Sequence, residues 1–351
     1  CEEPKVVKDT ISPRIIDGKI KLDDVTLTKE YLDNIDKIYI VACGTASHAG
    51  IVAKYLIERF GRISVEVDVA SEFRYRNPII TDKTLTIIIS QSGETIDTLF
   101  ALREAKSKGS RILSIVNVVG STIARESDEV IYTWAGPEIA VASTKAYNTQ
   151  LSVLYLIAID IGLKRGTLKK ERADELIKGL MEIPALLEKI LSTKEDIQKF
   201  SSEHFNSSSV FFIGRGLDYA LSMEGSLKLK EISYIHSEAY AGGELKHGTI
   251  ALIEEGTLVV CPMTQNSLME KMLSNIQEVK SRGATIMAIT SESNKNVVDA
   301  ADIVITIPDI DPVLAPLIAI TPMQLFAYYT SVQKGCDVDK PRNLAKSVTV
   351  E

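Results

Sequence analysis

The chain has 351 residues, which is enough for two domains of ordinary size. Hydrophobic residues make up 45% and charged residues 25%, a balance typical of globular proteins rather than of disordered or fibrous ones. Lys and Arg number 40 against 47 Asp and Glu, so the formal net charge is -7, and neither nucleic acid nor an anionic membrane is an expected partner.

The sequence offers no sign of a membrane span, a leader or a metal site. Its most apolar long stretch, Leu151–Leu163, contains Asp160 and is too short to cross a bilayer. No basic segment followed by an apolar one opens the sequence, so no secretory signal is expected. The four cysteines are scattered without a CxxC pair, which argues against a zinc site or a disulfide framework. We therefore expect a reducing, cytoplasmic setting and no bound metal.

In the first half of the chain, short apolar runs alternate with segments of helical period. The expected helices are Ser47–Phe60, Ile96–Lys108 and Ala146–Ile161. This alternation predicts a parallel sheet that is covered by helices on both faces. The runs expected to be its strands are Lys37–Ala42, Ile63–Val69, Thr84–Ser90, Arg111–Val116 and Glu129–Thr133.

The second half repeats this pattern. Gly44 pairs with Gly216 and Gly109 with Gly283, at offsets of about 172 and about 174 residues. The near-constant offset indicates an α/β fold made of two doubly wound parallel-sheet units, flavodoxin-like or Rossmann-like three-layer sandwiches related by internal duplication. The expected strands are Val210–Gly214, Thr257–Cys261, Ala284–Thr290 and Asp302–Ile307, and the expected helices are Leu268–Ser281 and Thr321–Lys334.

The two units are expected at residues 29–168 and 201–334. The charged, strand-free segment 169–200 is expected to be a helical connector, with Pro184 as a break between two of its helices. Residues 335–351 show no clear period and are expected to form an irregular C-terminal tail.

A polar loop, Ser90-Gln91-Ser92-Gly93-Glu94-Thr95, follows a buried strand and opens a helix. In open α/β sheets ligands bind at this edge, and a helix start presents free N–H groups to an anion. The hydroxyls of Ser90, Ser92 and Thr95 add further donors. The pattern is equally compatible with an ordinary Ser/Thr helix cap. A second polar loop is equally compatible with a sugar contact and with a plain helix cap. It consists of Val141-Ala142-Ser143-Thr144-Lys145.

Glu224, Lys228 and Glu231 lie within about 60° of one another around a helix, so all three point to one side. From the residues alone the favoured interpretation is a surface stripe of ion pairs. A general base would instead need a carboxylate beside an amine in a low-dielectric pocket. His247 lies in a Gly-rich polar loop, a setting compatible with either a structural or a functional histidine.

Five ordered motifs resemble the sugar-isomerase (SIS) domains of the glutamine–fructose-6-phosphate aminotransferase family, and the resemblance covers essentially the whole chain. The motifs are Cys43-Gly44-Thr45, Ser90–Leu99, Val141–Gln150, Leu227–His247 and Asp339–Glu351. Glu2–Ile11 resembles the segment that joins the family's glutaminase domain to the isomerase. The resemblance therefore implies two tandem SIS domains, an interdomain linker remnant at 1–28 that contains Cys1, an active-site tail at 335–351, and a glutaminase domain that is absent here.

The resemblance also implies roles for individual residues. Lys346 matches the lysine that forms a Schiff base with an open-chain ketose, and Glu231 matches the carboxylate that moves a proton between C1 and C2. His247 matches a histidine that assists ring opening across a subunit interface, which implies a homodimer. Glu224 and Lys228 match the helix neighbours of Glu231. The matched phosphate and sugar contacts are Thr45, Ser90, Gln91, Ser92, Thr95, Val141, Ser143 and Ala345.

One departure from the family pattern concerns the first motif. The family usually has Ser-Tyr after Cys-Gly-Thr, whereas Ala46-Ser47 stand here. Ala46 removes a hydroxyl that is expected near the sugar.

The implied activity is isomerisation of fructose 6-phosphate to an aldose, with glucose 6-phosphate and glucosamine 6-phosphate as the related ligands and no cofactor. Ammonia from a glutaminase domain would yield glucosamine 6-phosphate for the hexosamine and UDP-N-acetylglucosamine pathway. Two alternatives remain: a glucosamine-6-phosphate deaminase of the same fold, and a non-catalytic regulator that binds a sugar phosphate. A regulator would keep Ser90–Thr95 but has no need for Lys346 or Glu231.

Overall fold

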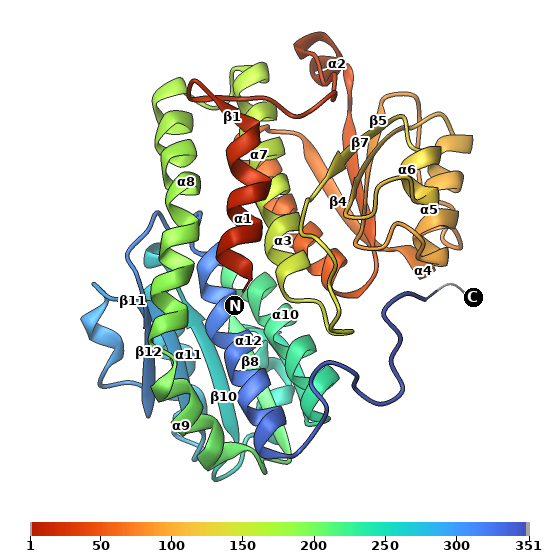
Figure 1. Ribbon diagram of the computed structural model, residues 1–351. Helices are drawn as coiled ribbons and strands as arrows, with labels where there is room; N and C mark the ends of the chain where they lie inside the picture. Colours follow the sequence, from red (N-terminus) through yellow and green to blue (C-terminus); the bar gives the residue numbers. More distant parts are fainter. Residues whose placement is uncertain (1, 349–351) are drawn as a thin grey trace. The chain divides into compact units, whose positions relative to one another are not determined.

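The computed structural model describes residues 2–348, which form two compact units (Figure 1). The N-terminal unit consists of Glu2–Glu138, Ser143–Met181 and the tail from Ala345 onward. The C-terminal unit consists of Ile139–Ala142 and Glu182–Leu344. Cys1 and residues 349–351 of the expected tail lie outside the described residues, so the expectations that fall on them have no structural counterpart. Among the helices of residues 2–348, none combines the length and the apolar character that crossing a bilayer requires.

A five-stranded parallel sheet in the order β4-β3-β5-β6-β7 is the centre of the N-terminal unit. Every strand begins and ends within one residue of its predicted bounds, because buried strands read as continuous apolar runs. The strands are β3 (Lys37–Ala42), β4 (Ser64–Val69), β5 (Thr84–Ser90), β6 (Arg111–Val116) and β7 (Glu129–Tyr132). The helices around them are α3 (Gly44–Phe60), α4 (Ala70–Phe73), α5 (Ile96–Ser107), α6 (Thr122–Glu126) and α7 (Lys145–Arg165).

Both faces of this sheet are covered, as predicted. Successive side chains of β3 point to opposite faces. Tyr39 and Val41 pack in one apolar cluster with Leu102 of α5. On the other face Ile40 lies against Gly50 of α3, where an added Cβ would come within 2.8 Å of the Ile40 Cγ2. Helix α3 packs on α7, which gives the three-layer arrangement visible in Figure 1.

Short elements that were not predicted from the sequence precede the sheet. They are α1 (Glu3–Ile11), a hairpin of β1 (Ile15–Ile16) and β2 (Lys19–Ile20), and α2 (Lys29–Asn34). Helix α1 packs along α7. The buried Arg14 guanidinium ties this segment to the sheet, because it donates both to Asp23 Oδ2 and to the Tyr132 carbonyl, each at 2.6 Å. The bond to the Tyr132 carbonyl links the segment to β7, while the bond to Asp23 stays within the segment.

The C-terminal unit repeats the same topology. Its parallel sheet has the order β12-β11-β10-β8-β9, which is strand for strand the order of the first sheet. The predicted internal duplication is therefore confirmed at the level of topology. The strands are β8 (Ser209–Gly214), β9 (His236–Ala241), β10 (Leu258–Met263), β11 (Thr285–Ser291) and β12 (Ile303–Ile307), and the helices are α9 (Glu195–His204), α10 (Leu217–Ser233), α11 (Met269–Lys280) and α12 (Pro316–Gln333).

Three features differ from the sequence prediction. Strand β9 was not predicted, because this edge strand has the polar sequence His-Ser-Glu-Ala-Tyr-Ala and remains half-exposed. Helix α12 begins at Pro316 rather than at Thr321, since proline is favoured in the first turn of a helix. Helix α8 (Lys170–Ser192) runs through Pro184, so the predicted break there is wrong. Buried apolar residues continue on both sides of it, and their burial offsets the one backbone hydrogen bond that a proline removes.

Candidate functional site

The loop Ser90–Thr95 lies at the carboxyl end of β5, where it leads into α5. Ser90 Oγ accepts a hydrogen bond from Gly93 N at 3.0 Å, and it lies 3.2 Å from Thr95 Oγ1. Ser92 Oγ accepts one from Glu94 N at 3.2 Å. Thr95 is the N-cap residue of α5, yet its side chain does not cap the helix. The plain-cap alternative is therefore wrong here: the hydroxyls gather around the loop instead of closing the helix end.

Gly93 is required by the geometry of this loop. Its φ is +67°, in the left-handed region that favours glycine. A Cβ at this position would lie 2.0 Å from Ser121 Oγ and 2.5 Å from Ser121 Cβ. Glu94 points to the same neighbouring segment, where its carboxylate accepts from Thr122 N at 2.7 Å, and that hydrogen bond lowers the pKa of Glu94. The loop is thus fixed from outside, with Gln91, Ser92 and Thr95 half-buried and Ser90 buried.

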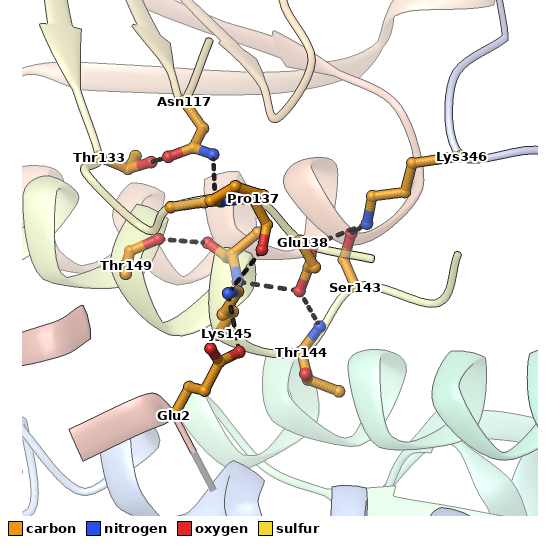
Figure 2. Close-up of polar contacts among 12 residues, drawn as sticks. Glu2, Asn117, Thr133, Pro137, Glu138, Ser143, Thr144, Lys145, Thr149 and Lys346 are labelled. Atoms are coloured by element: carbon orange, nitrogen blue, oxygen red, sulfur yellow. Dashed lines mark hydrogen bonds and ion pairs between the residues drawn. The ribbon is translucent and has the colours of Figure 1, made fainter. Parts of the chain in front are cut away.

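The start of α7 is capped by a residue that the sequence analysis did not single out (Figure 2). Glu138 Oε1 accepts hydrogen bonds from Thr144 N at 2.9 Å and from Ala146 N at 3.3 Å. The Thr144 side chain makes no cap bond, so the plain Ser/Thr cap predicted as an alternative for this loop is also wrong. A carboxylate at this end of a 21-residue helix is favoured by the helix dipole.

Lys346, the predicted Schiff-base lysine, reaches this carboxylate. Its Nζ lies 2.7 Å from Glu138 Oε2 and 3.2 Å from Ser143 Oγ. The Glu138 side chain is only 4% exposed, while that of Lys346 is 26% exposed. The structure therefore brings the predicted residues Lys346 and Ser143 together and adds Glu138 to them. A carboxylate within hydrogen-bond distance of a partly exposed amine is a chemically competent pair.

The residues after Lys346 contact the loop Ser90–Thr95. Ser347 Oγ lies 3.2 Å from Ser92 Oγ, and the Val348 carbonyl accepts from Ile96 N, at the first turn of α5, at 3.1 Å. The tail thus links Lys346 to the loop Ser90–Thr95 within one unit.

The predicted carboxylate–amine group lies on α10 of the C-terminal unit. Lys228 Nζ is 2.5 Å from Glu231 Oε2 and 3.4 Å from Glu224 Oε1. The Lys228 and Glu224 side chains are 2% and 0% exposed, so the surface-stripe interpretation is wrong. Burial acts to lower the pKa of Lys228, but the two carboxylates outweigh it, and the pKa lies above its usual value. Glu231 is 23% exposed and is the member of the group that solvent reaches.

The structure says less about the roles of the remaining predicted site residues. His247 is exposed and ends a short 3-10 helix (Leu245–His247). Val141 belongs to the C-terminal unit, where its N–H donates to the Asp339 carbonyl at 3.0 Å. Thr45 lies in the first turn of α3, and Ala345 is exposed in the tail. Ala46 and Ser47, which replace the family's Ser-Tyr, are both buried in α3.

The second copy of the fold differs from the first at the equivalent loop. The loop after β10 occupies the topological place of Ser90–Thr95, and there the Asp218 carboxylate accepts from Thr264 N at 2.8 Å, Thr264 Oγ1 at 2.5 Å and Gln265 N at 3.3 Å. Burial raises the pKa of Asp218 to about 6. The duplication offset of about 172 residues pairs Asp218 with Ala46, which has no carboxylate. An internal carboxylate thus accepts from the loop in the second copy, whereas alanine stands at the equivalent position of the first copy.

No group of three or more His, Cys, Asp or Glu side chains within residues 2–348 could hold a metal ion.

Comparison with known proteins agrees with this geometry. The SIS domain family matches residues 31–160 and 205–334, which together cover well over half of the chain. The chain belongs to the SIS domain family, with two tandem copies of the domain.

Sequence identity to individual relatives shows which branch of the family the chain resembles. The chain is 63% identical to glutamine–fructose-6-phosphate aminotransferase (isomerizing) of Caldanaerobacter subterraneus subsp. tengcongensis and 58% identical to that of Clostridium acetobutylicum. Each match covers all of this chain and 58% of the relative, so the chain spans a little over half the length of these relatives. The solved C-terminal domain of glucosamine-fructose-6-phosphate aminotransferase from Francisella tularensis is 40% identical, with a TM-score of 0.92, over 97% of this chain and 96% of that one. The chain corresponds to the isomerase region of the glutamine–fructose-6-phosphate aminotransferases.

Proposed function

We propose that the chain binds fructose 6-phosphate and isomerises it through a Schiff base on Lys346. The observation that carries this proposal is the tail geometry: Lys346 Nζ faces Ser143 and Glu138, while Ser347 Oγ lies 3.2 Å from Ser92 Oγ. A reactive amine and an anion-binding loop therefore belong to one constellation. A ketose phosphate has matching ends, an electrophilic carbonyl and an anionic phosphate.

The phosphate is expected at Ser90–Thr95. This loop offers hydroxyl donors at a helix start, and a helix start is a common place to bind an anion. The absence of an internal carboxylate from position 46 supports this assignment, since Asp218 takes the comparable donors in the second copy. We expect one sugar phosphate per chain, bound by the first copy of the domain.

Glu231 is the proposed carrier of the proton between C1 and C2. An imine at C2 makes the C1 hydrogens acidic, and a carboxylate that takes the proton at C1 can return it at C2. Its partial exposure beside two buried charged groups favours Glu231 over Glu224 for contact with substrate. Replacement of the lysine nitrogen by ammonia, followed by the same proton shift, yields glucosamine 6-phosphate. Without ammonia the imine on Lys346 exchanges its C1 hydrogen and hydrolyses back to the ketose, and glucose 6-phosphate forms by the same proton shift on the fraction of ketose that is bound without an imine.

The proposal includes a homodimer in which His247 of one chain assists ring opening in the other, and a glutaminase domain that supplies the ammonia. The exposure of His247 supports a role outside its own unit's core. The chemistry described needs no cofactor. A reducing, cytoplasmic setting is part of the proposal, supported by Cys43, Cys261 and Cys336, which are free thiols.

The test is exchange of the C1 hydrogen of fructose 6-phosphate with deuterium from D2O, followed by NMR. We expect exchange and formation of glucose 6-phosphate with the wild-type chain, and a loss of about 100-fold or more with Glu231→Gln at unchanged sugar-phosphate affinity. Tight binding without exchange would favour the regulator. Release of ammonia from glucosamine 6-phosphate as the dominant reaction would favour the deaminase.

A further inference from the structure

We propose that Glu138 is the counter-ion of the protonated Schiff base on Lys346. This inference rests on the proposed function, because the Schiff base is part of that proposal. Its starting point is the short contact between Glu138 Oε2 and Lys346 Nζ, at 2.7 Å, made by a carboxylate whose side chain is 4% exposed. The atom that this carboxylate faces is the atom that becomes the iminium nitrogen.

The direction of the carboxylate is fixed by hydrogen bonds. Glu138 Oε1 accepts from Thr144 N and Ala146 N, and these two bonds anchor it at the start of α7 (Figure 2). Backbone donors and the positive end of the helix dipole both face the Glu138 carboxylate there. With Oε1 engaged by the helix, Oε2 is left to face Lys346. Capping alone would not require the second oxygen to meet an amine.

The other lysine near this helix start has a different kind of environment. Lys145 Nζ is buried and donates to the Pro137 carbonyl and to Glu2 Oε2, both at 2.8 Å. Those bonds fix the backbone of the loop before α7 and join it to the segment that precedes α1. The contacts of Lys145 therefore serve the structure of the loop. The Lys346 amine, in contrast, is reached by solvent and lies beside a carboxylate and a hydroxyl. The charged groups at this helix start are thus Glu138, Lys346, Lys145 and Glu2.

The chemistry assigns a specific task to the carboxylate. The neutral Lys346 amine attacks C2 of the open-chain ketose, the C–N bond forms, and the carbonyl oxygen takes up a proton. The attacking nitrogen gives one of its hydrogens to solvent, and the carbinolamine hydroxyl takes up a proton and leaves as water as the nitrogen lone pair forms C=N. The nitrogen keeps one hydrogen and one positive charge. Removal of a C1 proton sends its electron pair into a C1–C2 double bond and neutralises the nitrogen. Only the charged imine acidifies C1 strongly, and a fixed carboxylate beside Nζ favours that charged form.

The experiment compares wild type with Glu138→Gln, which is close in shape but uncharged, and with Glu138→Ala. The control is Glu129→Gln on β7, whose 10%-exposed carboxylate pairs with Arg111 at 2.5 Å in the same unit, outside the site. The readouts are borohydride trapping of fructose 6-phosphate on Lys346, C1–H exchange over a pH series, and sugar-phosphate affinity.

For Glu138→Gln we expect trapping and exchange at neutral pH to fall by about 100-fold. Affinity for the sugar phosphate should stay within about threefold, since the loop Ser90–Thr95 is intact. The alkaline limb of the exchange profile should move to lower pH by about one unit or more, because the imine then loses its proton more readily. Added formate should restore part of the activity of Glu138→Ala, and Glu129→Gln should behave as wild type.

Unchanged trapping and an unshifted pH profile in Glu138→Gln would overturn the counter-ion role. So would a loss of activity that parallels a loss of folding and affinity without formate rescue, since Glu138 would then only brace α7. A wild-type chain that forms no adduct on Lys346 would remove the proposed function and this inference together. If wild type forms the adduct but the pH profile of Glu138→Gln is unshifted, only the counter-ion role is removed and the proposed function stands.

Discussion

Gly93→Ala is the substitution whose cost the structure defines most closely. The residue has a φ of +67°, and an added methyl group would meet Ser121 Oγ at 2.0 Å and Ser121 Cβ at 2.5 Å. Gly120→Ala is its matched control. Gly120 has a nearly equal φ of +72°, but an added Cβ there meets open space.

The two substitutions share the backbone cost and differ in the clash. A left-handed conformation costs a residue other than glycine about 1–2 kcal/mol, which is the whole expected effect at Gly120. Overpacking of a fixed neighbour typically adds about 1–3 kcal/mol. We therefore expect Gly93→Ala to lower the free energy of unfolding by about 2–5 kcal/mol, and to weaken sugar-phosphate binding because Gly93 N and the adjoining loop must shift.

Denaturant unfolding of both variants measures the difference, and calorimetry with fructose 6-phosphate measures the affinity. The double variant Gly93→Ala/Ser121→Gly should recover stability to about the level of Gly120→Ala, since it removes the atoms that clash. Equal losses in the two single variants, or no recovery in the double variant, would refute the close contact between Gly93 and Ser121.

Three further predictions concern the other charged and polar groups. Lys228→Ala should lower the free energy of unfolding by about 3–5 kcal/mol, because it leaves the buried Glu224 carboxylate without its cation; a loss below 1 kcal/mol in denaturant unfolding would speak against a buried pair. The pKa of Asp218 is about 6 in the folded chain and 3.8 when the carboxyl is exposed. Protonated Asp218 therefore adds to the free energy of unfolding below pH 4, and this contribution is lost as the pH rises through 6. Asp218→Asn should therefore gain up to about 3 kcal/mol relative to wild type between pH 4 and pH 7, and a flat difference would contradict the shift. Ser92→Ala with Thr95→Ala should weaken binding of fructose 6-phosphate far more than of free fructose; equal losses for the two sugars would count against a phosphate loop.

Much of the fold could be predicted because its signals are local. The central parallel strands are buried on both faces, so each appears in the sequence as an apolar run with sharp ends. Strand β9 lacks that signal, since its half-exposed edge position tolerates polar residues. Pro184 carries a strong local signal for a break, but the apolar stripe around it continues and the helix does too.

Part of the candidate site could also be predicted from local signals, and part could not. Ser90–Thr95 could be found from a strand followed by hydroxyls and a glycine, and helix geometry put Glu224, Lys228 and Glu231 on one side of α10. Their burial could not be predicted, because it depends on packing around α10 rather than on spacing along it. Glu138 was missed for a related reason: its partner Lys346 is 208 residues away in the chain. The sequence held one weak hint, an acidic residue just before the polar loop that opens α7.

Borohydride trapping with fructose 6-phosphate, followed by peptide mass mapping, tests the central claim most directly. We expect hydride reduction to fix the sugar phosphate on Lys346, and no adduct to form in Lys346→Ala, which should still bind the sugar phosphate. An adduct on another lysine, or tight binding with no adduct in the wild-type chain, would contradict the Schiff-base account.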